Sequence, residues 1–268
     1  MGMSSPVEVK KDQILSYVAH LNSLFAVKTV KRKLAALRSF FFYLEDCRVI
    51  EESPFYRIHL RIKEPFRMPQ VLTLTEVKRM LLAASREEEL PRMLHFRDVA
   101  VLEMLFCTGM RVQELCNLTT RDFNDRDNTL RIIGKGQKER RIAIYNPESL
   151  KILSRYMQLS QKYRRQSSWI FINRLGAPLS TQAVRNIVTK YALMAKVKKR
   201  VTPHMFRHTF ATLLLEAGVD IRFIQEYLGH SSVTTTQIYL HVSQPTAKRI
   251  LCQKHPRKTF SILQEDGL

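Results

Sequence analysis

The sequence predicts a mainly α-helical protein with one small antiparallel β-sheet, an α+β architecture, and three observations predict this class. Near the N-terminus, apolar residues recur at helical spacing. In the middle of the chain, two segments of alternating pattern, 129–133 and 140–144, flank a glycine-containing turn and predict a β-hairpin. Later in the chain the pattern is helical, with stops at Pro203, Gly218 and Gly229.

The first part of the chain, residues 1–66, predicts a small helical domain. Within residues 10–25, one helix face carries Ile14, Tyr17, Val18 and Leu21. A second helix, which Thr29 can cap, carries an apolar stripe made of Leu34, Leu37, Phe41 and Leu44. Basic residues lie off that stripe: Lys31, Arg32, Lys33 and Arg38. They form either a solvated helix face or a face that contacts phosphates.

A linker is predicted near 53–70, because three prolines interrupt any helix there. The linker is basic and includes Arg57, Arg61 and Lys63. An extended basic segment between two lobes can follow a DNA backbone, or it can serve only as a tether.

The remaining residues, 67–268, predict a second domain that begins with a helix. Thr73 and Glu76 have the spacing of a capping box. Helices are expected over 96–106 and 112–118, then the hairpin, and then a short strand near 169–173.

The charge of the chain predicts a polyanionic partner. Its 268 residues include 44 Lys and Arg against 24 Asp and Glu, which gives a net charge of +20. No apolar run approaches the roughly 20 residues that a membrane-spanning helix needs, so no membrane partner is expected. The four cysteines form no CxxC pair, which predicts reduced thiols and a cytoplasmic location.

Several ionisable residues lie at expected helix starts and turns, where side chains can converge on one site: Arg111, Glu114, Lys135, His204, Arg207, His230 and Tyr239. Each also has an ordinary structural explanation, and Tyr227, Tyr191 and Tyr145 rival Tyr239. A metal site at His204 and His208 is disfavoured, because the helix lacks the glutamate of a zinc protease and no third ligand is evident.

Together these residues suit phosphodiester chemistry. Two arginines can clamp the non-bridging oxygens of a phosphodiester and stabilise its transition state. A tyrosine can attack phosphorus, a lysine can protonate the departing oxygen, and histidines can move protons. No carboxylate cluster for two metals is evident, so a metal-free reaction is expected.

Five motifs resemble the tyrosine recombinase (phage integrase) family, and within it the Xer-like bacterial and mobile-element members. The motifs span residues 108–115, 134–140, 204–212, 228–232 and 236–242. They occur in the family's order, and the resemblance is strong over about 67–243 and looser over 28–66. The tail motif His255-Pro256-Arg257 also resembles the end of many Xer-like chains.

The resemblance implies a role for each matching residue. Arg111 and Arg207 match the two phosphate-clamping arginines, and Lys135 matches the hairpin lysine that acts as general acid. His204 matches a base or proton relay, and Tyr239 matches the nucleophile.

Two further residues match supporting positions. His230 matches the residue that supports the scissile phosphate, and Glu114 matches an acidic residue that orients the site. Beside the residues of the N-terminal domain and the linker, DNA contacts are also expected from Lys138 and Arg140 at the hairpin.

The implied function is site-specific DNA recombination through a 3′-phosphotyrosyl link and a Holliday junction, without cofactor, metal or ATP. It serves integration and excision of a mobile element or Xer-type dimer resolution. The implied partners are duplex DNA with a specific recombination site and further copies of the chain, as a tetramer on two sites. A partner recombinase or accessory factor is left open.

The resemblance also implies a domain plan. Residues 1–66 match a core-type DNA-binding domain, apparently shortened, and 67–268 match the catalytic domain. Residues 244–268 match a tail that docks on a neighbouring subunit, or the tail packs on its own chain. The alternatives to recombination are a type IB topoisomerase and a catalytically silent DNA-binding regulator of recombinase ancestry.

Overall fold

The computed structural model describes residues 5–56, 58, 60, 70–134, 139–164, 168–229 and 250–262. The chain divides into two compact units, unit 1 (Met1–Met68) and unit 2 (Pro69–Leu268). Among the described residues, no helix combines the length and apolar character needed to cross a membrane.

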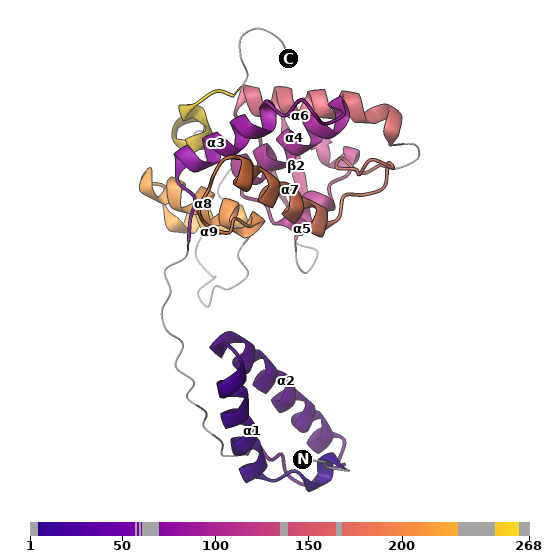
Figure 1. The fold of residues 1–268 in the computed structure, drawn as a ribbon, viewed down its shortest axis with the longest axis vertical. Helices are drawn as coiled ribbons and strands as arrows, with labels where there is room; N and C mark the ends of the chain where they lie inside the picture. The colour runs from indigo at the N-terminus through magenta and orange to yellow at the C-terminus, as the bar shows by residue number, and fades with distance from the viewer. Residues whose placement is uncertain are drawn as a thin grey trace. The chain divides into compact units, whose positions relative to one another are not determined.

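Unit 1 is built from a short 3-10 turn, η1 (Pro6–Glu8), and two helices, α1 (Lys11–Leu24) and α2 (Val27–Asp46) (Figure 1). The two helices bury a small apolar core: Ile14, Val18, Leu21, Val30, Leu34, Phe41, Leu44, Ile50, Phe55 and Ile58. Two details of the sequence prediction are wrong. Tyr17 is 40% exposed, because it lies beside the buried stripe of α1. The N-cap of α2 is Ala26, so Thr29 lies inside the first turn.

Unit 2 is mainly helical. Its helices are α3 (Leu74–Ser85), α4 (Arg92–Thr108), α5 (Val112–Cys116), α6 (Pro147–Ser160), α7 (Thr181–Met194), α8 (Pro203–Glu216) and α9 (Ile221–Leu228). Short 3-10 turns lie at Thr120–Asp122 (η2), Gln161–Tyr163 (η3) and Pro256–Thr259 (η4). The predicted capping box of α3 is confirmed: the Glu76 backbone N–H donates to the Thr73 hydroxyl, and the Thr73 N–H donates to the Glu76 carboxylate.

A three-stranded antiparallel sheet of order β1-β2-β3 completes unit 2, which confirms the predicted fold class. Its strands are β1 (Phe123–Asn124), β2 (Thr129–Ile133) and β3 (Glu139–Ala143). In the hairpin, Thr129 pairs with Ala143 and Ile133 pairs with Glu139. Residues 169–173 form no strand and make only two isolated bridges.

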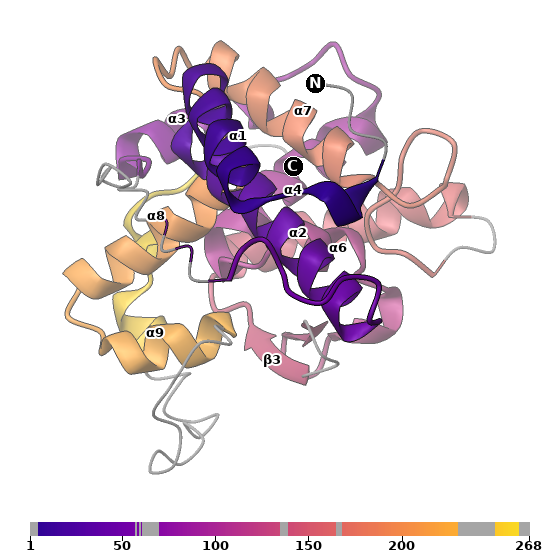
Figure 2. The same ribbon diagram turned by 90° about the horizontal axis from the view of Figure 1, so that it is seen from below.

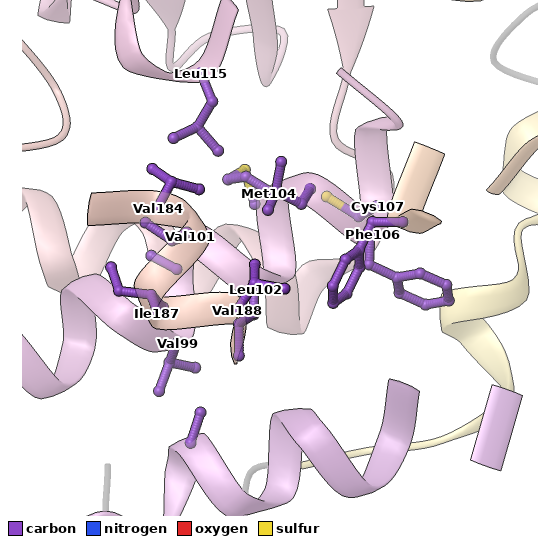
Figure 3. Close-up of a cluster of buried hydrophobic side chains, with 14 of the residues drawn as sticks. Val99, Val101, Leu102, Met104, Phe106, Cys107, Leu115, Val184, Ile187 and Val188 are labelled. Atoms are coloured by element: carbon purple, nitrogen blue, oxygen red, sulfur yellow. The ribbon is translucent and has the colours of Figure 1, made fainter. Parts of the chain in front are cut away.

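Helix α4 lies at the centre of unit 2 and contacts α3, α5, α6, α7 and α8. Because neighbours surround it, it is apolar on nearly all sides, and every residue from Asp98 to Thr108 is buried. Figure 3 shows side chains of α4 packed with Val184, Ile187 and Val188 of α7 and with Leu115 of α5. This rigid helix supports the turn that follows it.

The end of the described chain packs beside α8 and α9 (Figure 2). Residues 250–254 are helical, and η4 follows. Leu251 is buried with residues of α8 and α9, and Ile262 is buried in the larger core. These side chains pack on their own unit, whereas 244–249 and 263–268 lie outside the described residues. The subunit-docking role of the tail therefore remains a prediction.

Candidate active site

Two left-handed glycine turns define the site. Gly109 ends α4 with φ 60°, and Gly229 ends α9 with φ 68°. A left-handed residue is the usual way to end a helix and turn its last carbonyls outward. At Gly109 a Cβ would lie 2.7 Å from a ring atom of Phe210, so there is no space for a side chain. Both turns present carbonyl oxygens to arginines.

Arg207, on α8, is buried and held by two of these helix ends. Its guanidinium donates to the carbonyl of Gly109 at 3.0 Å and to the carbonyl of Leu228 at 2.7 Å. Helix C-termini carry partial negative charge, so they favour a cation at this place. Burial, reinforced by the positive charge of Arg111, lowers the pKa of Arg207 to about 10. The side chain therefore stays charged at neutral pH, in a fixed position.

Arg111 lies at the N-cap of α5 and is more exposed. Its guanidinium donates to the Gly229 carbonyl at 3.0 Å and to Glu114 Oε1 at 3.0 Å. The Arg111 backbone N–H donates to the other oxygen of Glu114, as in a capping box. The 35% exposure of the Arg111 side chain leaves part of its guanidinium open to an anion.

Glu114 joins two arginines. Both of its oxygens also accept hydrogen bonds from Arg140, at 3.0 and 2.7 Å. Burial alone would raise the pKa of Glu114, but the hydrogen bonds from Arg140 and the Arg111 backbone together lower it. Glu114 is therefore an ionised brace between β3 and α5.

Arg140 lies on β3 and points inward. Besides Glu114, it donates from Nε to the carbonyl of Tyr227 at 3.1 Å. The sequence predicts a DNA contact for Arg140, whereas the structure uses its guanidinium to connect β3 with the end of α9. The alternation of the strand explains the difference, because neighbouring Arg141 takes the exposed position.

His204 lies in the first turn of α8, which begins at Pro203. Partial burial, and after it the neighbouring His208 and Arg207, lower the pKa of His204. A lowered pKa keeps the ring neutral at pH 7, so one of its nitrogens can accept a proton. The rings of His204 and His208 are 6.4 Å apart. Within the described residues, no group of three or more potential metal ligands gathers.

The other predicted site residues are only partly described. Lys135, Lys138, His230 and Tyr239, together with Arg57, Arg61 and Lys63 of the linker, lie outside the described residues. In unit 1, Lys31 and Arg32 are exposed, and Lys33 lies over the Phe25 ring at 4.8 Å. Arg38 donates to the Ile58 carbonyl at 3.2 Å, so part of its guanidinium serves its own unit.

The sequence analysis predicts that Arg111, Glu114, His204 and Arg207 converge on one site. The structure places them around the ends of α4 and α9. Sequence reasoning missed the carbonyls of Gly109 and Gly229 as partners of the arginines. The signal was present, because each glycine directly follows a segment with a helical pattern. The contacts themselves follow only from the tertiary fold.

Comparisons with known proteins agree with this geometry. Residues 70–245 match the model of the phage integrase family. The chain is 40% identical to a tyrosine recombinase of Agathobacter rectalis, over 97% of this chain and 87% of the relative. It is 37% identical to the tyrosine recombinase XerC of Bacillus subtilis, over 86% of this chain and 75% of the relative.

A solved structure has the same fold. It is the XerH site-specific recombinase bound to a palindromic difH substrate in a post-cleavage complex, with a TM-score of 0.74 and 22% identity. The likeness covers 96% of this chain and 72% of that one. The extent of these matches, together with the arginine site, shows that the chain belongs to the phage integrase family and is a Xer-like tyrosine recombinase, an enzyme of site-specific DNA recombination.

Proposed function

We propose that this recombinase cleaves a specific site in duplex DNA by attack of Tyr239 on the scissile phosphate. The observation that carries the proposal is the pair of arginines fixed by helix-end carbonyls beside His204, whose pKa is lowered. Arg207 is buried and immobile, and Arg111 is partly open. This arrangement suits a phosphodiester, which binds two guanidinium groups through its non-bridging oxygens.

In the proposed cleavage, one bond to phosphorus forms while another breaks, and each proton has a donor and an acceptor. The Tyr239 oxygen attacks phosphorus and gives its proton to His204, while the bond from phosphorus to the 5′ oxygen breaks. Lys135 protonates the departing 5′ oxygen, which leaves a free 5′-hydroxyl and a 3′-phosphotyrosyl ester. The ester keeps the energy of the broken bond, so rejoining needs no ATP. Arg111 and Arg207 stabilise the added negative charge of the transition state, and His230 supports the same phosphate.

The surroundings of the three rival tyrosines favour Tyr239 as the nucleophile. Burial raises the pKa of Tyr145 to about 12 and raises that of Tyr227 further. The Tyr191 hydroxyl is buried and donates to Asp98 Oδ2 at 3.2 Å. These three hydroxyls are poor nucleophiles; those of Tyr227 and Tyr191 are buried, and Tyr145 is half-buried.

In the second half of the proposed reaction, the 5′-hydroxyl of a partner duplex attacks each phosphotyrosyl link. Two such exchanges give a Holliday junction, and two more resolve it, which requires four protomers on two sites. The proposed assembly is therefore a tetramer, in which the two parts of 244–268 outside the described residues, 244–249 and 263–268, dock one subunit on the next. Residues 1–66 hold the core site through exposed Lys31 and Arg32, together with the basic linker.

Covalent trapping tests the proposal. The full chain is incubated with nicked duplexes whose cleaved strand loses the short fragment that bears the free 5′-hydroxyl, using candidate sites from the flanks of its own gene. Denaturing gels compare wild type with Tyr239→Phe. An adduct on the 3′ side that is absent from Tyr239→Phe supports the proposal, and cleavage at the gene flanks favours a mobile-element role over dimer resolution. DNA binding by wild type with no adduct at any site supports a silent regulator.

The choice of general acid has its own test. Lys135 and Lys138 are three residues apart in the segment for which the sequence predicts a turn, so each serves as the matched control of the other. We expect Lys135→Ala to slow adduct formation by about 10²-fold or more, and Lys138→Ala to change it little. Equal rates for the two variants would overturn this assignment.

A further inference from the structure

The described end of the chain is locked into the core of unit 2 by a buried arginine. Arg257 is 0% exposed. Its guanidinium donates to Glu103 of α4 at 2.6 Å, to Glu148 of α6 at 2.7 Å and to the Phe260 carbonyl at 2.6 Å. These contacts fix the backbone on both sides of Pro256. They place the neighbouring residue His255 against the end of α4.

His255 completes the end of α4. Its Nδ1 accepts a hydrogen bond from the Arg257 backbone N–H at 3.0 Å, so in the neutral ring Nε2 carries the proton. Nε2 then donates to the carbonyl of Cys107 at 2.7 Å. The last carbonyls of a helix have no partner within the helix. The N–H of Arg111, four residues after Cys107, donates to Glu114 instead. His255 therefore satisfies this carbonyl.

The hydrogen bond between His255 and the Cys107 carbonyl lies next to the backbone that holds Arg207. Gly109, whose carbonyl accepts from Arg207, lies two residues after Cys107. Phe210 follows Arg207 by one turn of α8, and its ring lies 5.5 Å from the His255 ring. The Phe210 ring also fills the space where a Gly109 side chain would lie. His255 thus touches both the backbone that holds the guanidinium and the helix that carries it.

We propose that His255 is a positioning residue for DNA cleavage, acting through the Cys107 carbonyl and the Phe210 ring to hold the Gly109 turn that orients Arg207. The proposal rests on the proposed role of Arg207 at the scissile phosphate. It makes the C-terminal segment a part of the active-site support, although its own side chains need not touch DNA.

Two substitutions separate the two hydrogen bonds of His255. Gln places an amide N–H near the position of Nε2, so His255→Gln keeps the donor to Cys107 and loses the acceptor for Arg257. Asn places its amide group near the position of Nδ1, so His255→Asn keeps the acceptor, which caps η4, and loses the donor. We expect single-turnover adduct formation to be about 10-fold slower in His255→Asn than in His255→Gln, because small displacements of a clamping group slow the reaction strongly.

A modified substrate distinguishes positioning from loss of fold. A methylphosphonate at the scissile position is neutral, so cleavage depends less on the charge of Arg207. We expect the difference between the two variants to shrink toward one-fold on this substrate, and we expect the same of the difference between wild type and Arg207→Ala. Both variants should bind the unmodified duplex within about two-fold of wild type.

Two results would overturn the inference. One is an equal cleavage rate for His255→Gln and His255→Asn on the ordinary phosphodiester. The other is a rate difference that persists unchanged on the methylphosphonate, which would show a general loss of structure. Failure of the proposed function is distinguishable, because wild type itself would then form no adduct.

Discussion

Two of the arginine–carboxylate clusters of unit 2 differ in their exposure to solvent. At the active site, Glu114 joins Arg111 and Arg140, whose side chains are 35% and 15% exposed. At the C-terminal segment, Glu103 and Arg257 are both fully buried. The first cluster leaves an arginine open to a ligand, whereas the second closes its arginine on three sides. The same type of ion pair therefore leaves an arginine available to bind a ligand in the first cluster, and it stabilises the fold in the second.

The exposure of an ion pair to solvent determines which of the two roles it can have. A buried charge costs several kcal/mol of desolvation, which only close partners offset, so it cannot be released without loss of structure. A partly exposed guanidinium can exchange water for phosphate at little cost. Gly109 and His255 lie between the clusters. Substitutions in either cluster, or at these two residues, therefore test the difference between them.

The largest expected effect is on stability at the buried cluster. Arg257→Met leaves Glu103 without its partner, and we expect the free energy of unfolding of unit 2 to fall by about 3–5 kcal/mol. The double variant Glu103→Leu with Arg257→Met should recover most of this loss. Arg131→Met is the control, because Arg131 is 43% exposed and its pairs contribute about 0–1 kcal/mol. Urea unfolding measures all three, and a small loss for Arg257→Met would erase the contrast.

The next effect is on cleavage at the exposed cluster. We expect Arg111→Ala and Arg207→Ala each to slow adduct formation by about 10²–10³-fold, since each removes a donor to the developing charge. DNA affinity should stay mostly intact, because many other phosphate contacts remain. Exposed Arg126→Ala is the control, and full cleavage by either site variant would remove that arginine from the site.

The third effect is a pH dependence of stability from His255. Burial lowers its pKa from the ordinary 6.5 to about 4. Between these values the unfolded chain binds a proton that the folded chain does not, so stability is complete above pH 6.5 and falls as pH drops toward 4. The expected loss is on the order of 3 kcal/mol. Unfolding curves for His255→Gln should lack this slope, and an identical slope in both proteins would contradict the prediction.

The smallest effect concerns the turn that joins the two clusters. Gly109→Ala places a Cβ 2.7 Å from Phe210 in a left-handed conformation, so we expect a loss of more than the roughly 1–2 kcal/mol that left-handed strain alone costs. Gly218→Ala, at φ 73° and with only an ordinary contact at 3.5 Å between its Cβ and Lys254 Nζ, should show the strain alone. Thermal unfolding compares the two, and cleavage should fall only in Gly109→Ala.

Local patterns in the sequence predicted the elements whose signals lie within a few residues. The capping box of Thr73 and Glu76 and the hairpin of β2 and β3 are such cases. Helix α6 was missed, although Asn146 and Pro147 are a good helix start and Ile152 and Tyr156 share a buried face. The orientation of Arg140 could not be read, because strand alternation gives two faces and the fold decides which one is buried.

The sequence by itself predicted the chemical groups of the site, since Arg111, Lys135, His204, Arg207, His230 and Tyr239 follow one another in the order that the family's motifs have. It also predicted some of the helix ends, such as the start of α3 at Thr73 and the end of α9 at Gly229. The tertiary structure decided what holds those groups. Arg207 contacts Gly109 across 98 positions, Arg111 contacts Gly229 across 118, and His255 contacts Cys107 across 148. Contacts at such separations depend on how helices pack, because helix-end carbonyls accept whichever donor the fold brings to them.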